Sequence, residues 1–241
     1  ALVNYLTFGL QVNSWDADTE IVHFLGKDNA RMHALLWPCM LKSAGYEIPD
    51  HIYINAFLSL NGKKISKSLG NVVAPKDLVE KYGVDPVRYY FLRYGPIVED
   101  SDFSETHFQT VYNADLANGL GNTVARLAKL AEKSGFSFAF DTENNSILST
   151  ELAQYFDVFR VDLALQHIWS KISDLDKKIN EEEPWSIKNS EKLKEVLQSE
   201  IEDLILIAKL CKPFMPETSE KIIGVFKKEK ITAIGGLFPR I

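Results

Sequence analysis

The chain has 241 residues, of which 46% are hydrophobic and 25% are charged, a composition typical of a globular protein with a sizeable core. Its length predicts one large domain or two medium ones. The net charge of -6, from 27 basic and 33 acidic residues, argues against a nucleic-acid binder that relies on bulk positive charge, so any contact with RNA must use a local patch.

The first quarter of the chain predicts a strand, a helix and a second strand. Residues 20–28 form a short β-rich run that ends in Gly26-Lys27-Asp28, residues 29–44 have a helical pattern, and residues 51–60 form an apolar run. A strand–helix–strand unit of this length predicts parallel strands in a doubly wound sheet. Ligands of such sheets bind beyond the carboxyl ends of the strands, where the glycine turn and the segment after residue 60 both fall.

The helix expected over residues 29–44 places His33 and Trp37 on one face, at positions i and i+4. Pro38 lacks a backbone N–H group and is expected to kink the helix. A packed core pair is the simpler interpretation of the two side chains. Their position beside the expected ligand crevice favours instead a pocket for an apolar side chain.

The segment after the second strand is rich in lysine, serine and glycine. It reads Asn61-Gly62-Lys63-Lys64-Ile65-Ser66-Lys67-Ser68-Leu69-Gly70-Asn71. A cationic loop at the end of a strand suits a polyphosphate, because lysines neutralise the phosphate charge and glycines let the backbone approach. The alternative is a solvated hairpin turn, since Asn-Gly favours hairpins and lysines favour surfaces.

Residues 74–104 are expected to form a small connecting unit. Pro75 opens a short helix, and Asp85-Pro86 opens another, with an N-cap followed by proline at the first helical position. An irregular acidic stretch, Gly95 to Ser104, follows. We therefore expect a domain boundary near residue 104.

The rest of the chain has a helical apolar pattern. Helices are expected over residues 105–133, 150–182, 190–212 and 216–228, with turn-rich breaks between them. Four helices joined by short loops predict an antiparallel bundle. The apolar tail, residues 233–241, is expected to pack back on the body of the protein.

Two polar features stand out in this helical part. Asn118, Asn122 and Arg126 lie at i, i+4 and i+8 and form one polar stripe, whose amide and guanidinium groups are suited to reading base edges. The alternative is a polar contact between helices, which the spacing alone favours. Trp185 follows Pro184 in a charged loop, either as a lid on the bundle or as a stacking platform for an unpaired base.

The two cysteines, Cys39 and Cys211, lie far apart, and neither belongs to a CxxC pair. This spacing argues against a zinc site and a disulfide framework, and it favours a reducing, cytoplasmic compartment. No 18-residue apolar run and no signal peptide are recognised, so no membrane contact is expected. The first residues, ALVNYL, have the character of the inside of an element, which suggests a fragment.

Taken together, these segments resemble the methionyl-tRNA synthetase family of the class I aminoacyl-tRNA synthetases. Residues 64–68, KISKS, are similar to the class I signature KMSKS, with Ile65 in the methionine place. Other segments carry a more specific resemblance: ALVNY at 1–5, GKD at 26–28, HALLWP at 33–38, SKSLGNVV at 66–73, NADLAN at 113–118, PW at 184–185 and LFPRI at 237–241. The resemblance covers essentially the whole chain.

The resemblance implies an α/β plus all-α fold in three parts. Residues 1–73 would be the C-terminal half of a doubly wound, Rossmann-like catalytic domain, residues 74–104 a connecting unit similar to the family's stem-contact unit, and residues 105–241 a helical anticodon-binding domain. The first half of the nucleotide fold, with its His-Ile-Gly-His-type motif and metal-bearing insertion, is missing. This chain alone is therefore expected not to activate methionine.

The resemblance also implies the roles of individual residues. Lys64 and Lys67 would be catalytic, stabilising the pyrophosphate side of ATP while the methionine carboxylate attacks the α-phosphorus. The expected ATP-binding residues are Gly26, Asp28, Phe57, Ile65, Ser66 and Lys67; the expected methionine-binding residues are Ala1, Leu2, Tyr5, His33 and Trp37; the expected anticodon-binding residues are Asn118, Asn122, Arg126 and Trp185. Aromatic rings suit a polarisable thioether, and histidine or tyrosine can donate to its sulfur. The chain departs from the family at Asn55-Ala56, where His-Gly is common, so adenine contacts are not carried over there.

The implied reaction forms methionyl-adenylate from ATP and methionine and transfers methionine to tRNA(Met), which is recognised through its CAU anticodon. Mg²⁺ is expected to accompany ATP, and no metal site is expected in the chain itself. The expected partners are tRNA(Met), methionine, ATP and the missing half-domain. Two alternatives stay open: a non-catalytic module in which residues 105–241 grip an anticodon-like RNA loop, and a class I synthetase for another hydrophobic amino acid.

Overall fold

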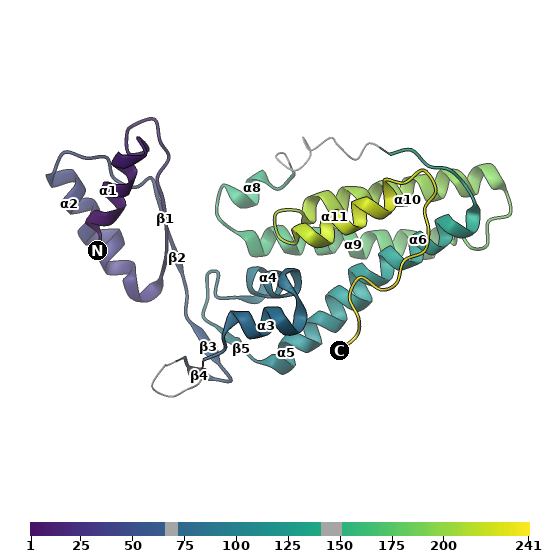
Figure 1. Cartoon of the computed structure of the whole chain (residues 1–241), viewed down its shortest axis with the longest axis horizontal. Coiled ribbons are helices and arrows are strands. Elements are labelled where there is room, and N and C mark those ends of the chain that lie inside the picture. Colours follow the sequence, from purple (N-terminus) through teal and green to yellow (C-terminus); the bar gives the residue numbers. More distant parts are fainter. Residues whose placement is uncertain (66–71, 141–150) are drawn as a thin grey trace. The chain divides into compact units, whose positions relative to one another are not determined.

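The computed structural model describes residues 1–65, 72–140 and 151–241, and the chain forms two compact units (Figure 1). Unit 1 contains residues 1–64 and 96–102, and unit 2 contains residues 65–95 and 103–241. The chain thus leaves unit 1 after Lys64 and returns to it for one short segment. The division into three domains at residues 73 and 104 stays a prediction.

Unit 1 is built on a parallel pair of strands. β1 (Val22–Gly26) pairs with β2 (His51–Asn55), in a register that runs from Val22 opposite His51 to Gly26 opposite Asn55. Side chains alternate along β1, so that His23 and Leu25 are buried while Phe24 is exposed. The parallel pairing expected from the strand–helix–strand spacing is confirmed. Its extension into a doubly wound sheet stays a prediction.

The helical segment between these strands is irregular. A 3-10 turn, η1 (Lys27–Asn29), follows β1, and a π-helix, η2 (Met32–Leu36), precedes α2 (Trp37–Ser43). Pro38 lies in the first turn of α2 and has no N–H group for a helical hydrogen bond, which accounts for the wider turn before it. The chain begins with α1 (Val3–Gln11), which agrees with the element-like character of the first residues.

The prediction of one strand over residues 51–60 is wrong. β2 ends at Asn55, and β3 (Leu58–Leu60) belongs to a second sheet of order β4-β3-β5, in which β4 is Lys63–Lys64 and β5 is Ser101–Phe103. The N–H groups of Ala56 and Phe57 donate to Pro96 O at 3.0 Å and to Asp100 Oδ1 at 2.9 Å. These acceptors lie far along the chain, so no local pattern marks the break.

Unit 2 is helical. Its elements are α3 (Pro75–Tyr82), α4 (Val84–Tyr94), α5 (Glu105–Val111), the π-helix η4 (Tyr112–Gly121), α6 (Asn122–Ser134), α8 (Ala153–Phe156), α9 (Val161–Glu182), α10 (Ser190–Cys211) and α11 (Pro216–Phe226). α10 lies beside α9, α11 and α6 (Figure 1). Their apolar faces form a shared core, to which Leu127, Ile168, Leu204 and Phe226 belong.

Two local predictions in unit 2 are wrong. The helix expected over residues 150–182 is broken between α8 and α9, where Phe159 has a left-handed backbone with φ of 55°. Asp85 is not the N-cap of α4, because Gly83 precedes that helix. The buried Asp85 carboxylate instead accepts the Thr218 N–H group at 2.6 Å and caps the first turn of α11.

The C-terminal tail packs back on unit 2, as predicted. Phe238 is buried, and its ring lies 6.0 Å from that of Tyr112, centroid to centroid. The Asn113 side chain bonds the backbone of Ile241, donating to its oxygen at 2.7 Å and accepting from its N–H group at 3.2 Å. Within the described ranges, no helix is both long enough and apolar enough to cross a membrane.

Candidate functional site

Aromatic side chains from separate elements gather in unit 1. Tyr5 of α1 meets His23 of β1 with ring centroids 4.8 Å apart, and Trp37 of α2 at 6.3 Å. The Tyr5 hydroxyl lies 3.1 Å from His33 Nε2. The aromatic cluster consists of Tyr5, Trp15, His23, His33 and Trp37. The structure therefore brings Tyr5, His33 and Trp37 together across 32 residues of sequence, although their role stays a prediction.

The hydrogen bonds of His33 define its neutral tautomer. Its Nδ1 lies 3.1 Å from the carbonyl oxygen of Asn29, which can only accept, so Nδ1 carries the proton. Nε2 then accepts from the Tyr5 hydroxyl in the neutral ring. Burial, and then the neighbouring His33, lower the pKa of His23 below its ordinary value, so the neutral form of the His23 ring is favoured.

Two buried nitrogen atoms of the cluster have no hydrogen-bond partner among the described residues: Trp37 Nε1 and His23 Nε2. An indole N–H can only donate, so Trp37, which is 1% exposed, keeps an unused donor within the buried part of the cluster. Aromatic rings with such a donor suit an apolar, polarisable side chain with a weak acceptor atom. Ala1 and Leu2 begin the turn that carries Tyr5, because Leu2 O accepts the Tyr5 N–H group at 3.1 Å.

Sequence reasoning missed His23 and Trp15 as members of the cluster. His23 sits on the same face of β1 as Leu25, so the strand alternation alone could have marked it as buried. The Trp15 indole N–H donates to Glu47 O at 3.0 Å, across the loop before β2. No local sequence pattern predicts the contact between Trp15 and Glu47.

The predicted nucleotide edge is the carboxyl end of the parallel pair, where Gly26 lies opposite Asn55. A Cβ atom on Gly26 would lie 2.9 Å from Asp28 Oδ1, so glycine leaves room for the Asp28 carboxylate to fold back over the turn. Asp28 is exposed, and Phe57 is 45% exposed beyond the end of β2. The Lys27 ammonium lies 5.4 Å from the centre of the Phe57 ring. This edge combines an exposed carboxylate, an exposed ring and a cation.

The lysine segment begins as a hairpin. Lys64 of β4 lies opposite Ser59 of β3, and the turn residues Asn61 and Gly62 have φ values of 52° and 71°. The hairpin reading of Asn61-Gly62 is therefore right for the start of the segment, and it leaves the side chains of Lys63 and Lys64 exposed. Ile65 is half-buried, and Ser66 and Lys67 lie outside the described residues.

In unit 2 the guanidinium group of Arg126 lies over the ring of Trp185, with Cζ 4.8 Å from its centre. Arg126 also donates to Asn180 Oδ1 at 2.7 Å and to Asp176 Oδ1 at 3.3 Å. Trp185 remains 53% exposed. One face of α6 is thus joined to α9 and to the loop after it, so Arg126 takes part in a polar contact between helices. Stacking of an unpaired base on Trp185 stays a prediction.

Asn118 and Asn122 are exposed, one turn apart from each other on the helix that carries Arg126. Asp176 and Asn180, which hold Arg126, were missed by sequence reasoning. Their i,i+4 spacing on α9 places them on one face, but the pairing of α9 with α6 is a tertiary feature. This side of the helical unit thus carries the Trp185 ring and the Arg126 guanidinium group. The side-chain amides of Asn118 and Asn122 lie on the helix leading to Arg126.

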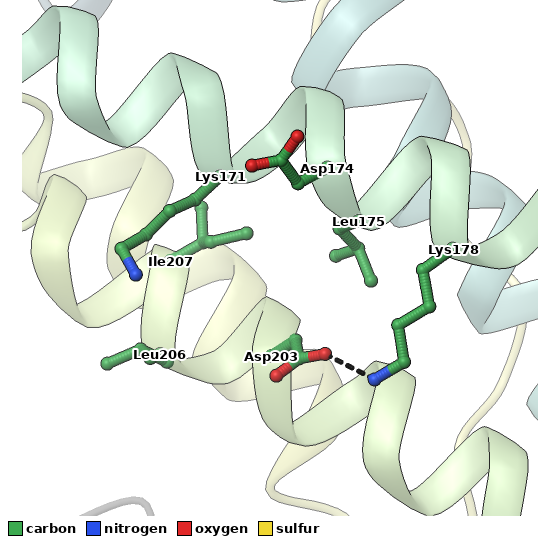
Figure 2. Close-up of a pocket in the computed structure, with 7 residues that line it drawn as sticks. All are labelled: Lys171, Asp174, Leu175, Lys178, Asp203, Leu206 and Ile207. Atoms are coloured by element: carbon green, nitrogen blue, oxygen red, sulfur yellow. Dashed lines mark hydrogen bonds and ion pairs between the residues drawn. The ribbon is translucent and has the colours of Figure 1, made fainter.

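A buried acid lies within electrostatic range of Arg126. Neither carboxylate oxygen of Glu200, on α10, has a partner within the part of the chain that the structure describes. Lys178, the other nearby cation, is engaged by Asp203 at 2.6 Å and by Ser199 at 2.8 Å. Figure 2 shows Lys178 reaching Asp203 across a cavity of about 220 Å³ between α9 and α10. Burial, and then the neighbouring Glu182, raise the pKa of Glu200 to about 7.

Within the described ranges 1–65, 72–140 and 151–241, no group of three or more His, Cys, Asp or Glu side chains could hold a metal ion.

The sequence of the chain is similar to those of methionine–tRNA ligases. The family model for "tRNA synthetases class I (M)" matches residues 1–128. The methionine–tRNA ligase of Fusobacterium nucleatum subsp. nucleatum is 38% identical over 243 residues, which cover 92% of this chain and 38% of that protein. The methionine–tRNA ligase of Mycobacterium leprae is 34% identical over 255 residues, covering 95% of this chain and 47% of that protein.

A solved structure of a methionyl-tRNA synthetase also matches the fold of the chain. Mycobacterium tuberculosis methionyl-tRNA synthetase in complex with methionyl-adenylate matches 99% of this chain with a TM-score of 0.84 and 31% sequence identity. The match covers 55% of that chain. The chain therefore spans about half the length, or less, of the relatives it matches.

Proposed function

The chain belongs to the class I tRNA synthetases (M), a family of enzymes, and on this premise we propose that it forms part of a methionine–tRNA ligase. Such an enzyme activates methionine with ATP and transfers it to tRNA(Met). The chain contributes three parts: the lysine hairpin, the aromatic cluster and the helical unit that contacts the anticodon. We propose the cytoplasm as the site of action.

The observation that carries the proposal is the aromatic cluster, assembled from α1, β1 and the η2–α2 segment. Its aromatic rings suit the methionine side chain, because a thioether is polarisable and interacts favourably with aromatic edges. Tyr5 contacts both His33 and Trp37, and these three side chains would line the pocket, with Ala1 and Leu2 just before the helix that carries Tyr5. A branched aliphatic substrate has no acceptor atom for the unpaired Trp37 donor.

ATP would bind at the carboxyl edge of the parallel strands, which would belong to a doubly wound sheet. Gly26 and Asp28 would lie against the ribose, and Phe57 near the adenine. Lys64 and Lys67 would stabilise charge on the pyrophosphate as it leaves, with Ile65 and Ser66 in the same segment. Mg²⁺ would arrive with ATP as part of the substrate.

The helical unit would recognise the CAU anticodon of tRNA(Met) as an antiparallel bundle. Trp185 offers an exposed ring on which an unpaired base can stack, and Arg126 lies over that ring with its guanidinium fork. Asn118 and Asn122 add amides that pair with base edges. An overall negative charge is compatible with this, because recognition would depend on a local patch.

Exposed apolar side chains in unit 1 support the proposal of a further half-domain. Phe8 is 67% exposed, and Phe24 and Leu35 are each 61% exposed, although large apolar side chains are normally covered. We propose that the first half of the nucleotide fold covers these side chains and completes the ATP site. The 241-residue chain would then bind RNA by itself but require that half for catalysis.

Binding of an anticodon stem-loop tests the RNA-binding part on the chain as it is. The chain is expected to prefer a CAU stem-loop to one in which the first anticodon base is changed. Arg126→Ala and Trp185→Ala should each weaken binding by about 1–3 kcal/mol. Lys129→Ala, an exposed cation on the same helix, is the matched control.

Equal affinity for both loops would contradict anticodon recognition, as would an equal loss for the control variant. Catalysis is tested separately by ATP–pyrophosphate exchange with the half-domain supplied. A chain that binds the loop specifically but never supports exchange would favour the alternative of a non-catalytic RNA-binding module.

A further inference from the structure

An acidic segment, residues 96–102, runs along the connection from β2 to the lysine hairpin. The Tyr53 hydroxyl donates to Ile97 O at 2.9 Å, and the Ser101 N–H group donates to Phe57 O at 2.9 Å. Both contacts lie within unit 1. The segment therefore follows the connection from the end of β2 to β3, where the proposed nucleotide edge lies.

Asp100 joins the two loops of this edge. Its Oδ1 atom accepts the Phe57 N–H group at 2.9 Å and the Lys27 ammonium at 3.3 Å. The bond to Phe57, and then that to Lys27, lower the pKa of Asp100 below its ordinary value, so it is ionised at neutral pH. The glycine turn after β1 and the start of β3 are thus tied to one carboxylate.

Asp102 holds the lysine hairpin itself. Its Oδ1 atom accepts the Ser59 hydroxyl at 2.5 Å and the Gly62 N–H group at 2.8 Å. Ser59 lies directly opposite Lys64, and Gly62 is a turn residue with a left-handed backbone. One carboxylate oxygen therefore fixes both a strand residue of the hairpin and its turn.

The β3–β4 hairpin is short, so the hydrogen bonds from Asp102 matter for its stability. β4 is two residues long and pairs with β3 at Ser59–Lys64 and Leu60–Lys63. β4 is an edge strand of the three-stranded sheet β4-β3-β5, and among the described strands it pairs with β3 alone, whereas Asp102 lies on β5. Charge-assisted hydrogen bonds to an ionised carboxylate are stronger than neutral ones, so Asp102 can hold a turn that the ladder alone would leave free to twist.

We propose that Asp102 is a positioning residue for Lys63 and Lys64, acting through its hydrogen bonds to Ser59 and Gly62. The assignment rests on the proposed function, in which Lys64 faces the pyrophosphate side of ATP. In this assignment Asp102 acts through the hairpin and not by contact with a substrate. Its loss would let the hairpin twist, and a displacement of about 1 Å at a reacting group can cost roughly 100-fold in rate.

Two measurements on Asp102→Ala test the assignment. In the 241-residue chain, amide hydrogen exchange at Gly62 is expected to become at least about tenfold faster, because its acceptor is removed. In the protein completed by the half-domain, kcat for ATP–pyrophosphate exchange is expected to fall about 10–100-fold. The KM for methionine should stay within about twofold, because the aromatic cluster does not contact Asp102.

Asp102→Asn and Glu99→Ala are the matched variants. Asparagine keeps an acceptor oxygen, so Asp102→Asn should recover most of the kcat and most of the Gly62 protection. Glu99→Ala removes an equal charge from the same exposed stretch and should behave as wild type in both measurements.

The outcomes separate this assignment from the function on which it rests. A wild-type protein without methionine-dependent exchange would overturn both. An active wild type with an equally active Asp102→Ala variant would overturn the assignment alone. So would a variant that loses methionine affinity and kcat together, or an asparagine variant as impaired as the alanine variant.

Discussion

Replacing Glu200 by glutamine should stabilise the protein at alkaline pH and leave it unchanged in acid. Glu200 is fully buried on α10, and neither of its oxygens is bonded within the described ranges. Its charged neighbours are Glu182 and Lys178 on α9, Arg126 on α6 and Asp203 on α10. Both cations are engaged by other acceptors. The ionised carboxylate is therefore disfavoured in the folded state.

The pKa values give the size of the effect. The ordinary carboxyl pKa of 4.5 is raised to about 7 in the folded protein. Between these values the folded state holds a proton that the unfolded state has lost, so stability falls as the pH rises. The cost is absent below pH 4.5, is complete above about pH 7, and amounts to about 3 kcal/mol.

Urea unfolding of wild type and Glu200→Gln at pH 5 and pH 8, followed by far-UV circular dichroism, measures this cost. The difference in the free energy of unfolding should be small at pH 5 and should reach about 2–3 kcal/mol in favour of the variant at pH 8. Glu202→Gln, an exposed neighbour on the same helix, should show no such pH dependence. A Glu200→Gln difference that is equal at both pH values would refute the argument.

Three further predictions concern single contacts. Asp85→Ala should destabilise unit 2 by about 1–3 kcal/mol in a denaturant titration, because the start of α11 loses its cap; unchanged stability would contradict the capping role. Tyr5→Phe should raise the methionine KM in pyrophosphate exchange with little change in the KM for ATP, and the reverse pattern would exclude Tyr5 from the pocket. Arg126→Ala and Trp185→Ala should be non-additive in stem-loop binding, since the two side chains stack; full additivity in a double-mutant cycle would show independent roles.

Local sequence patterns predicted the elements whose causes are local. The helical stripes of α9, α10 and α11, the proline start of α3, and the parallel pairing of β1 with β2 follow from periodicity, capping residues and connection length. The i,i+4 spacing of His33 and Trp37 likewise placed both on one face. Tyr5 was recognised from the family resemblance, because no spacing rule links α1 to that helix.

The errors have non-local causes. The strand over residues 51–60 breaks because Ala56 and Phe57 donate to a segment that returns from unit 2. Asp85 has the pattern of an N-cap for its own helix, yet it caps α11, far along the chain. Asp102 was visible in the sequence as part of an acidic stretch, but its role depends on which turn it meets in space. Pairing between distant segments is the information that a single sequence lacks.

The most direct test of the proposed function is amino-acid-dependent ATP–pyrophosphate exchange by the protein completed with its half-domain. We expect methionine to support exchange, leucine, isoleucine and valine to support it far less, and Lys64→Ala to abolish most of it. Exchange that is equally rapid with a branched aliphatic amino acid, or that survives Lys64→Ala unchanged, would contradict the proposed function.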